Sequence, residues 1–278
     1  MFKIYFKTGW RSLLRNKIYS FINVLGLGIG LAIVMLIILY SKDELSFDRF
    51  HRNAESIYRI VIDVQTPDPS TSGKMGTSSI FDGPHYTAAI PEMESFVRLK
   101  SNYFDVKVGE NLKSQNVFKA DTNFFSLFSF PFLKGNPETA LIHPSSVVLS
   151  EDMAKNYFGT VDVLNKSVLI NRNDSFEPFT ITGVTRRCPQ TSSIKFDLMI
   201  PLAAPVSNDN GIWLQCDLHT FVKLSDKAIV SSVNTKMQRV FEVEAKEILT
   251  TIRSMYGASV GFQHQLQPLH GIHLSEDF

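Results

Sequence analysis

The chain contains no acidic residue before Asp43 and no charged residue of either sign between Lys17 and Lys42. As a helix, the uncharged stretch from Ile18 to Tyr40 would be roughly 34 Å long, against a bilayer hydrocarbon core of about 30 Å. A water-soluble helix needs a polar face, which this stretch lacks. We therefore predict a transmembrane helix at residues 18–41.

The charges around this stretch predict its orientation. Five cations and no anion precede it, namely Lys3, Lys7, Arg11, Arg15 and Lys17. Beyond it the charges are mixed: Lys42, Asp43, Glu44, Asp48 and Arg49. The positive-inside rule places the N-terminus in the cytoplasm and residues 42–278 outside. A cleaved signal peptide fits less well, because its apolar region is about 7–15 residues long and no small-x-small cleavage motif follows Tyr40.

Residues 1–17 contain two further periodic patterns. Aromatic residues recur at every fourth position, at Phe2, Phe6 and Trp10, and cations follow one position later, at Lys3, Lys7, Arg11 and Arg15. A helix here would carry an aromatic stripe beside a basic one, and would lie in the headgroup layer against anionic lipid. The alternative is that these cations only set the topology of the membrane anchor.

Two glycines in the span, Gly26 and Gly30, have the small-xxx-small spacing that lets another membrane helix approach closely. Glycine is frequent in membrane helices, so this pattern indicates helix packing only weakly. The pair does not form a dinucleotide-binding motif, because it lies in a membrane span and not in a strand-turn-helix unit.

The remaining sequence offers few residues suited to catalysis or cofactors. GTVDVLNKS (Gly159 to Ser167) has the wrong spacing for a phosphate loop, and His270 and His273 have no third metal ligand at suitable spacing. No Ser or Cys lies in a nucleophile elbow, and three carboxylates resemble an exposed helix face near the membrane: Asp43, Glu44 and Asp48. The 28 basic and 27 acidic residues form no clustered basic face for nucleic acid. We predict no enzyme activity, cofactor or metal.

Cys188 and Cys216 are the only cysteines. The predicted topology places both outside the cytoplasm, where a disulfide persists if the compartment is oxidising. Their separation does not establish that they meet, so a disulfide and two buried thiols both stay open.

The part beyond the span is predicted to mix helices and strands, an α+β class. Strands are expected at 57–64, 94–100, 104–108, 115–120, 146–149, 167–171, 179–184, 195–200, 220–224 and 259–268. Helices are expected before Pro91, with an interruption near Pro84, at NFFSLF after an Asp121 or Thr122 cap, and at EDMAKNYF between Ser150 and Gly159. One long helix is expected to begin at Asp226, with one apolar face at Ile229, Val233, Met237, Val240, Phe241, Ile248 and Ile252.

Several longer stretches carry a family resemblance. RSLLRNKIYSFINVLGLGIGLAIVMLIILY and DELSFDRFHRNAESIYRI resemble the start of a MacB/FtsX-type ABC transporter permease, most like the form common in Bacteroidetes. The resemblance continues through ADTNFFSLFSFPFLKGNPETAL, SSVVLSEDMAKNYFG and FTITGVTRRCPQTSSIKFDLMIPL, and covers essentially the whole chain. Two positions depart from the pattern: Asn165 replaces a usual Gly, and Cys188 stands where a polar residue is usual.

The resemblance implies a single N-terminal transmembrane helix and a MacB-like periplasmic core domain. A porter-like subdomain would comprise residues 42–105 and 213–278, with a strand-rich subdomain inserted at 106–212. The implied function is mechanotransmission across the bacterial inner membrane for export or efflux. A separate cytoplasmic ABC ATPase would supply the energy, and the permease would act as a homodimer or in a pair, with room for a periplasmic or outer-membrane partner.

Permeases of this type carry further membrane helices after the periplasmic domain, whereas this chain reaches Phe278 without a second hydrophobic span. We therefore expect a partial permease. The competing interpretations are a single-pass sensory or ligand-binding protein, which would need a defined pocket, and a membrane-anchored enzyme, which would need a cleft with perturbed titratable groups.

Overall fold

The computed structural model describes residues 5, 11, 15, 17–172, 174–203, 213–257 and 260–275. The chain divides into two compact units, Met1–Ser46 and Phe47–Phe278. Each unit is described by itself.

The first unit is dominated by one long helix, α2 (Lys17–Glu44), whose residues are all outside any core. Its 28 residues correspond to about 42 Å of helix. Among the described residues it is the one helix long and apolar enough to cross a membrane. A side chain added at Gly26 or Gly30 would meet nothing within 4 Å, so this surface of α2 is open.

The predicted membrane-surface helix is only partly described. Arg11 and Arg15 are helical and exposed. The other residues of that prediction lie outside the described residues: Phe2, Lys3, Phe6, Lys7 and Trp10.

The second unit contains one mixed sheet of 12 strands among the described residues. The strand order is β12-β1-β11-β4-β5-β10-β7-β9-β6, with β2 on β1, β3 on β11, and β8 on both β4 and β9. Its strands are β1 (Ile57–Gln65), β2 (Gly73–Met75), β3 (Ser78–Ser79), β4 (Met93–Val108), β5 (Asn111–Ala120), β6 (Phe132–Gly135), β7 (Ser146–Ser150), β8 (Ser167–Arg172), β9 (Ser175–Thr185), β10 (Leu198–Pro201), β11 (Cys216–Leu224) and β12 (Gly261–Pro268).

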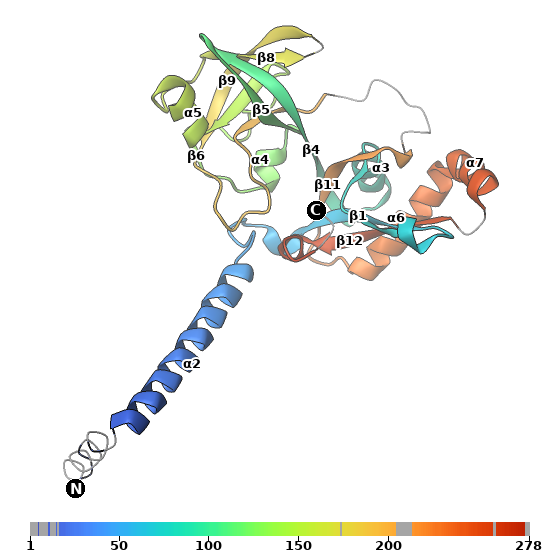
Figure 1. Ribbon diagram of the computed structural model, residues 1–278. Coiled ribbons are helices and arrows are strands. Elements are labelled where there is room, and N and C mark those ends of the chain that lie inside the picture. Colours follow the sequence, from blue (N-terminus) through green and yellow to red (C-terminus); the bar gives the residue numbers. More distant parts are fainter. Residues whose placement is uncertain are drawn as a thin grey trace. The chain divides into compact units, whose positions relative to one another are not determined.

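The helices of this unit are α3 (Asp82–Ala89), α4 (Phe124–Leu127), α5 (Glu151–Phe158), α6 (Val230–Glu244) and α7 (Lys246–Tyr256). Figure 1 shows α3, α6 and α7 grouped with β1, β11 and β12, and α5 grouped with β8 and β9. The α+β class predicted from the sequence is confirmed.

Three core clusters fill the unit. The first is rich in phenylalanine and includes Phe124, Phe128, Phe130, Phe196 and Phe221. The second lies between the helices α3, α6 and α7 and the strands β1, β11 and β12. The third lies between α5 and the strands β5, β7, β8, β9 and β10, with Val106 of β4.

Strand β4 runs through all three clusters. Met93 belongs to the second cluster, Val97 and Leu99 to the first, and Val106 to the third. The sequence predicts two strands here, but the structure contains one of 16 residues. Alternate side chains of the middle section are exposed, so its polar residues do not interrupt the ladder with β5.

The long helix predicted from Asp226 is wrong in two respects. The chain forms α6 and α7, separated at Ala245, whose φ of −89° and ψ of 12° are not helical. The change of direction lets both Phe241 and Leu249 enter the second cluster. Ile229 precedes α6 and is 68% exposed, so it does not belong to the buried face.

Smaller differences concern helix ends. Pro84 lies in the first turn of α3, where its missing N–H costs no helical hydrogen bond, and the helix is not interrupted. Asn123 occupies the N-cap position of α4 without a side-chain capping bond, since its Nδ2 donates to the Phe96 carbonyl. The predicted cap Asp121 pairs with Arg98 instead. The predicted ends of α5 at Ser150 and Gly159 are confirmed.

Candidate functional site

The second unit begins with a junction segment, residues 47–52, that follows directly on the membrane-helix unit in the chain. Asp48 is fully buried and has a φ of 57°, a left-handed conformation that Asp and Asn tolerate better than most residues. Its N–H donates to the Thr191 carbonyl at 2.8 Å, and its Oδ1 accepts from the Ser193 N–H at 2.9 Å. The junction segment is thereby fixed to a loop more than 140 residues later in the chain.

The charge state of Asp48 depends on the same contacts. Burial raises the pKa of its carboxyl group above the ordinary value, and the hydrogen bonds from Ser193 partly offset this effect. Removing the Ser193 contact would leave a buried carboxylate with fewer donors, which is costly.

His51 connects the junction segment to the first core cluster. Its Nδ1 accepts from the Ser129 N–H at 3.0 Å, and the Arg52 N–H donates to Ser129 Oγ at 3.1 Å. The His51 ring centroid lies 5.1 Å from those of Phe128 and Phe130. Burial lowers the pKa of His51 to about 4, so at neutral pH it is an uncharged ring that accepts one hydrogen bond.

Phe47 connects the junction segment to the C-terminal part of the unit. Its ring stacks on His273, with centroids 3.4 Å apart and an interplanar angle of 5°. Ile272, the preceding residue, is fully buried in the first core cluster. Within six residues the junction segment therefore contacts three distant segments, at Ser129, at 191–193 and at His273.

Sequence reasoning did not find this site. The sequence predicts that Asp48, with Asp43 and Glu44, belongs to an exposed helix face. This is wrong for Asp48, because the helix ends at Glu44 and the Asp48 side chain is buried in the second unit. Burial of an acidic residue depends on donors supplied by Thr191 and Ser193, which local sequence cannot show.

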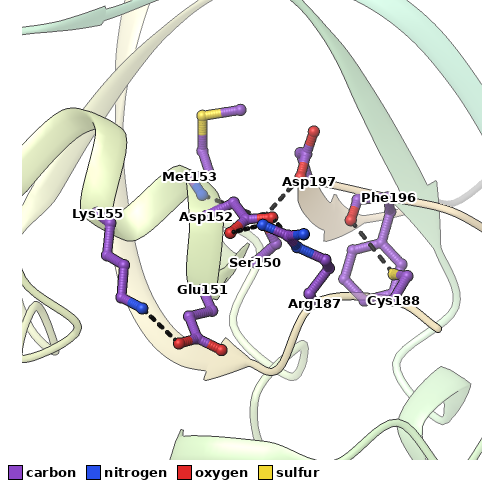
Figure 2. A network of polar contacts seen from close by, with 9 residues as sticks. All are labelled: Ser150, Glu151, Asp152, Met153, Lys155, Arg187, Cys188, Phe196 and Asp197. Atoms are coloured by element: carbon purple, nitrogen blue, oxygen red, sulfur yellow. Dashed lines mark hydrogen bonds and ion pairs between the residues drawn. The ribbon is translucent and has the colours of Figure 1, made fainter. Parts of the chain in front are cut away.

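A second polar network surrounds the start of α5 (Figure 2). Ser150 Oγ accepts from the Met153 N–H at 3.2 Å and donates to Asp197 Oδ1 at 2.6 Å. This second bond connects the start of α5 to the residue that precedes β10. Arg187 forms a bidentate pair with Asp152, at 2.5 and 2.8 Å, and lowers the pKa of that carboxyl group. These contacts hold the helix in place and bring no reactive group together.

The two cysteines are free thiols, so the disulfide considered as an alternative is absent. Cys188 packs against the first core cluster, and its Sγ lies 3.5 Å from the Phe196 carbonyl (Figure 2). Cys216 lies at the start of β11, opposite Ser79. Burial raises the pKa of both thiols, that of Cys216 to about 12, so neither is an activated nucleophile.

The segment excluded as a phosphate loop is a structural connection. Gly159 ends α5 with a φ of 71°, and the Asn165 N–H donates to the Ile181 carbonyl at 2.9 Å. Asn165 has a φ of 64°, which explains why glycine suits this position. Across the described part of the chain no cluster of three or more His, Cys, Asp or Glu side chains could hold a metal ion.

A comparison with models of protein families identifies the family of the chain. The model of the MacB-like periplasmic core domain matches residues 20–240, which is most of the chain. The chain belongs to this family. MacB-like periplasmic core domains occur in permeases of ABC-type transporters, so the resemblance predicted from the sequence is confirmed.

One solved structure supports this fold, and two others are less similar. A domain of a protein described as a permease from Porphyromonas gingivalis matches with a TM-score of 0.61 and 19% identity, over 78% of this chain and 91% of that chain. The periplasmic region of MacB from Actinobacillus actinomycetemcomitans has a TM-score of 0.49 and 16% identity, over 80% and 93%. The extracellular domain of the noncanonic ABC-type transporter YknZ from Gram-positive bacteria has a TM-score of 0.45 and 12% identity, over 74% and 99%. No curated protein matches the chain significantly.

Proposed function

We propose that the chain is part of the permease subunit of an ABC-type transporter, and that its outer domain moves as a partner ATPase binds and hydrolyses ATP. The observation that carries this proposal is the junction segment. It follows the membrane helix in the chain, and its backbone and side chains are fixed to three separate parts of the folded unit. A force on residues 47–52 therefore reaches these parts together.

The contacted parts correspond to the proposed subdomains. Ser129 and Thr191 lie in the inserted subdomain proposed at 106–212, and His273 lies in the second porter-like segment, 213–278. The second core cluster draws on residues from both porter-like segments, 42–105 and 213–278, which supports their assignment to one subdomain. Strand β4 and the junction segment would connect that subdomain to the insertion.

We further propose a bacterial inner-membrane location with a cytoplasmic N-terminus, supported by the five cations that precede the span. Ser70, which is exposed, provides the test. In a variant with Cys188 and Cys216 changed to Ser, S70C should react with a membrane-impermeant maleimide in intact spheroplasts. Reaction only after lysis would reverse the topology.

The proposed assembly contains a cytoplasmic ABC ATPase and a second permease copy or a paired permease. The open surface at Gly26 and Gly30 would contact another membrane helix, and the basic stripe of residues 1–17 would contact lipid of the inner leaflet. The outer domain would contribute binding and movement, while ATP hydrolysis would reside in the ATPase. A periplasmic or outer-membrane protein would receive the exported substrate.

The transporter assignment is tested by tagging the protein in its own cells and purifying it from detergent-solubilised membranes. Mass spectrometry should identify an ABC ATPase in amounts comparable to the tagged protein. A signalling protein in its place, without any ATPase, would contradict the proposal and favour the single-pass sensor.

A further inference from the structure

We propose that a polar cavity beside the junction segment binds the headgroup of a phosphatidylethanolamine-type phospholipid, which carries one phosphate and one primary ammonium. This inference depends on α2 being in the membrane, but not on the transport role proposed above.

The cavity has a volume of about 840 Å³. Its wall is formed by most residues of the range 49–58, by Leu224, Ser225, Asp226 and Ala228, and by His270. Cavities that bind small molecules in proteins are roughly 300–1,000 Å³, so this one has room for a headgroup and part of the glycerol. Two other hollows in the described structure are much smaller, about 310 and 280 Å³.

Five titratable side chains of this wall are exposed. Arg49 and Arg52 are cations, Glu55 and Asp226 are carboxylates, and His270 is the fifth. None of the five takes part in an ion pair with another residue in the described ranges. Elsewhere in this unit exposed opposite charges do pair, as Lys134 does with Asp162.

The two signs of charge match the two ends of the headgroup. The guanidinium groups of Arg49 and Arg52 each offer a planar fork of donors that suits phosphate oxygens. The carboxylates of Glu55 and Asp226 suit an ammonium with three N–H donors. A ligand with only negative charge would meet these carboxylates as well as the arginines, so the cavity favours a zwitterion over an anion.

Chain length limits the distance between the cavity wall and the end of α2. Arg49 is the fifth residue after Glu44, where α2 ends, and five residues span at most about 18 Å. At about 42 Å, α2 is longer than the hydrocarbon core, so a membrane-spanning α2 would end in or near a headgroup layer. Arg49 would then be at most about 18 Å from that end of the helix, and this short connection favours a lipid headgroup as the ligand.

The test uses the full chain purified in a non-ionic detergent and three probes: monomeric dihexanoyl phosphatidylethanolamine, dihexanoyl phosphatidylglycerol and inorganic phosphate. Calorimetric titration should give measurable binding of phosphatidylethanolamine, at least fivefold weaker binding of phosphatidylglycerol, and none of phosphate. Phosphate binding as tightly as phosphatidylethanolamine would show a plain anion site, and equal or tighter binding of phosphatidylglycerol would overturn the headgroup assignment.

Two double variants separate the two ends of the headgroup. Arg49→Gln with Arg52→Gln should weaken phosphatidylethanolamine binding at least tenfold, and Glu55→Gln with Asp226→Asn should abolish the preference over phosphatidylglycerol. Because all four side chains are exposed and unpaired, circular dichroism should show unchanged folding. Arg253→Gln, an exposed change of the same charge on α7, is the matched control and should bind as the parent does. Undiminished binding in the arginine double variant would place the lipid elsewhere and overturn the proposal.

Discussion

His264 Nε2 lies 3.8 Å from Asp82 Oδ1 beside Tyr86 and Phe241 of the second core cluster, and the two side chains are 1% and 0% exposed. Asp82 Oδ2 accepts from the Ser79 N–H at 2.8 Å, but Asp82 Oδ1 and both His264 nitrogens have no hydrogen-bond partner among the described residues. Burial raises the pKa of Asp82 to about 7 and lowers the pKa of His264 to about 3. At mildly acidic pH the folded pair therefore holds one proton, on Asp82, and no net charge.

The two groups make opposite contributions to the pH dependence of stability. Between about pH 4 and 6.5, folded Asp82 keeps a proton that the unfolded chain releases, so its contribution to stability falls as pH rises towards 7. Over the same range folded His264 lacks a proton that the unfolded chain binds, so its contribution rises with pH. We expect the two slopes to cancel largely in the parent protein.

Single substitutions should reveal each slope. Relative to the parent, Asp82→Asn loses the falling contribution of the aspartate, so its free energy of unfolding should rise more steeply between pH 4 and 6.5, by at most about 1.4 kcal/mol per pH unit. His264→Gln loses the rising contribution of the histidine, so its stability should fall relative to the parent over the same range. Urea unfolding at closely spaced pH values measures both. Parallel pH profiles in the two variants would contradict the assignment.

Asp48 provides a prediction about the junction segment. Asp48→Ala removes the acceptor for the Ser193 N–H. It also places alanine, which lacks the short polar side chain of Asp or Asn, at a φ of 57°. The loss should be about 2–4 kcal/mol, from the unmade buried hydrogen bond and the left-handed backbone. Asp48→Asn keeps an acceptor oxygen and tolerates this φ, so its loss should be about 1 kcal/mol or less. Denaturant unfolding of both variants provides the measurement.

The network at the start of α5 predicts a contrast between a buried and an exposed contact. Ser150→Ala removes the helix N-cap and the bond to Asp197, and should cost about 1–2 kcal/mol. Arg187→Ala removes a bidentate pair, but the Arg187 side chain is 74% exposed, so the loss should stay below about 1 kcal/mol. If thermal unfolding showed equal losses of stability in the two variants, the Arg187–Asp152 ion pair would stabilise the protein more than its exposure predicts.

Gly135 should tolerate no side chain. Its φ is 88°, and an added Cβ would collide with the Thr182 carbonyl oxygen of the neighbouring strand β9. Gly135→Ala should therefore destabilise the unit by about 2 kcal/mol or more. Gly159 also has a positive φ, 71°, but an added Cβ meets nothing within 4 Å. Gly159→Asn is the matched control and should lose about 1 kcal/mol or less in the same unfolding assay.

Local signals account for what the sequence predicted correctly. The strand β1 and the two ends of α5 each depend on residues that lie close together in the sequence, such as the caps Ser150 and Gly159 of α5. The family resemblance added the MacB-like fold to the α+β class, because it draws on the order of motifs along the whole chain.

Long-range contacts account for what the sequence did not predict. The break at Ala245 and the burial of Asp48, Asp82 and His264 depend on partners far away in the chain. The residues around Asp48 in the sequence would be the same whether its side chain were exposed or buried against the Ser193 N–H. The five exposed titratable residues of the cavity likewise come from three separate segments, and their proximity follows from the fold alone.

The central claim is that the junction segment transmits movement to the outer domain, and electron paramagnetic resonance measures this most directly. In the permease complex with its ATPase, native cysteines are replaced by Ser, and Tyr103, which is 76% exposed, is changed to Cys and spin-labelled. The distance between labels in the two protomers should shift on ATP binding in the parent and in Asp48→Asn. Asp48→Gly accepts the positive φ but loses the Ser193 contact, so its shift should be much smaller while ATP hydrolysis continues. An undiminished shift in Asp48→Gly would contradict the account.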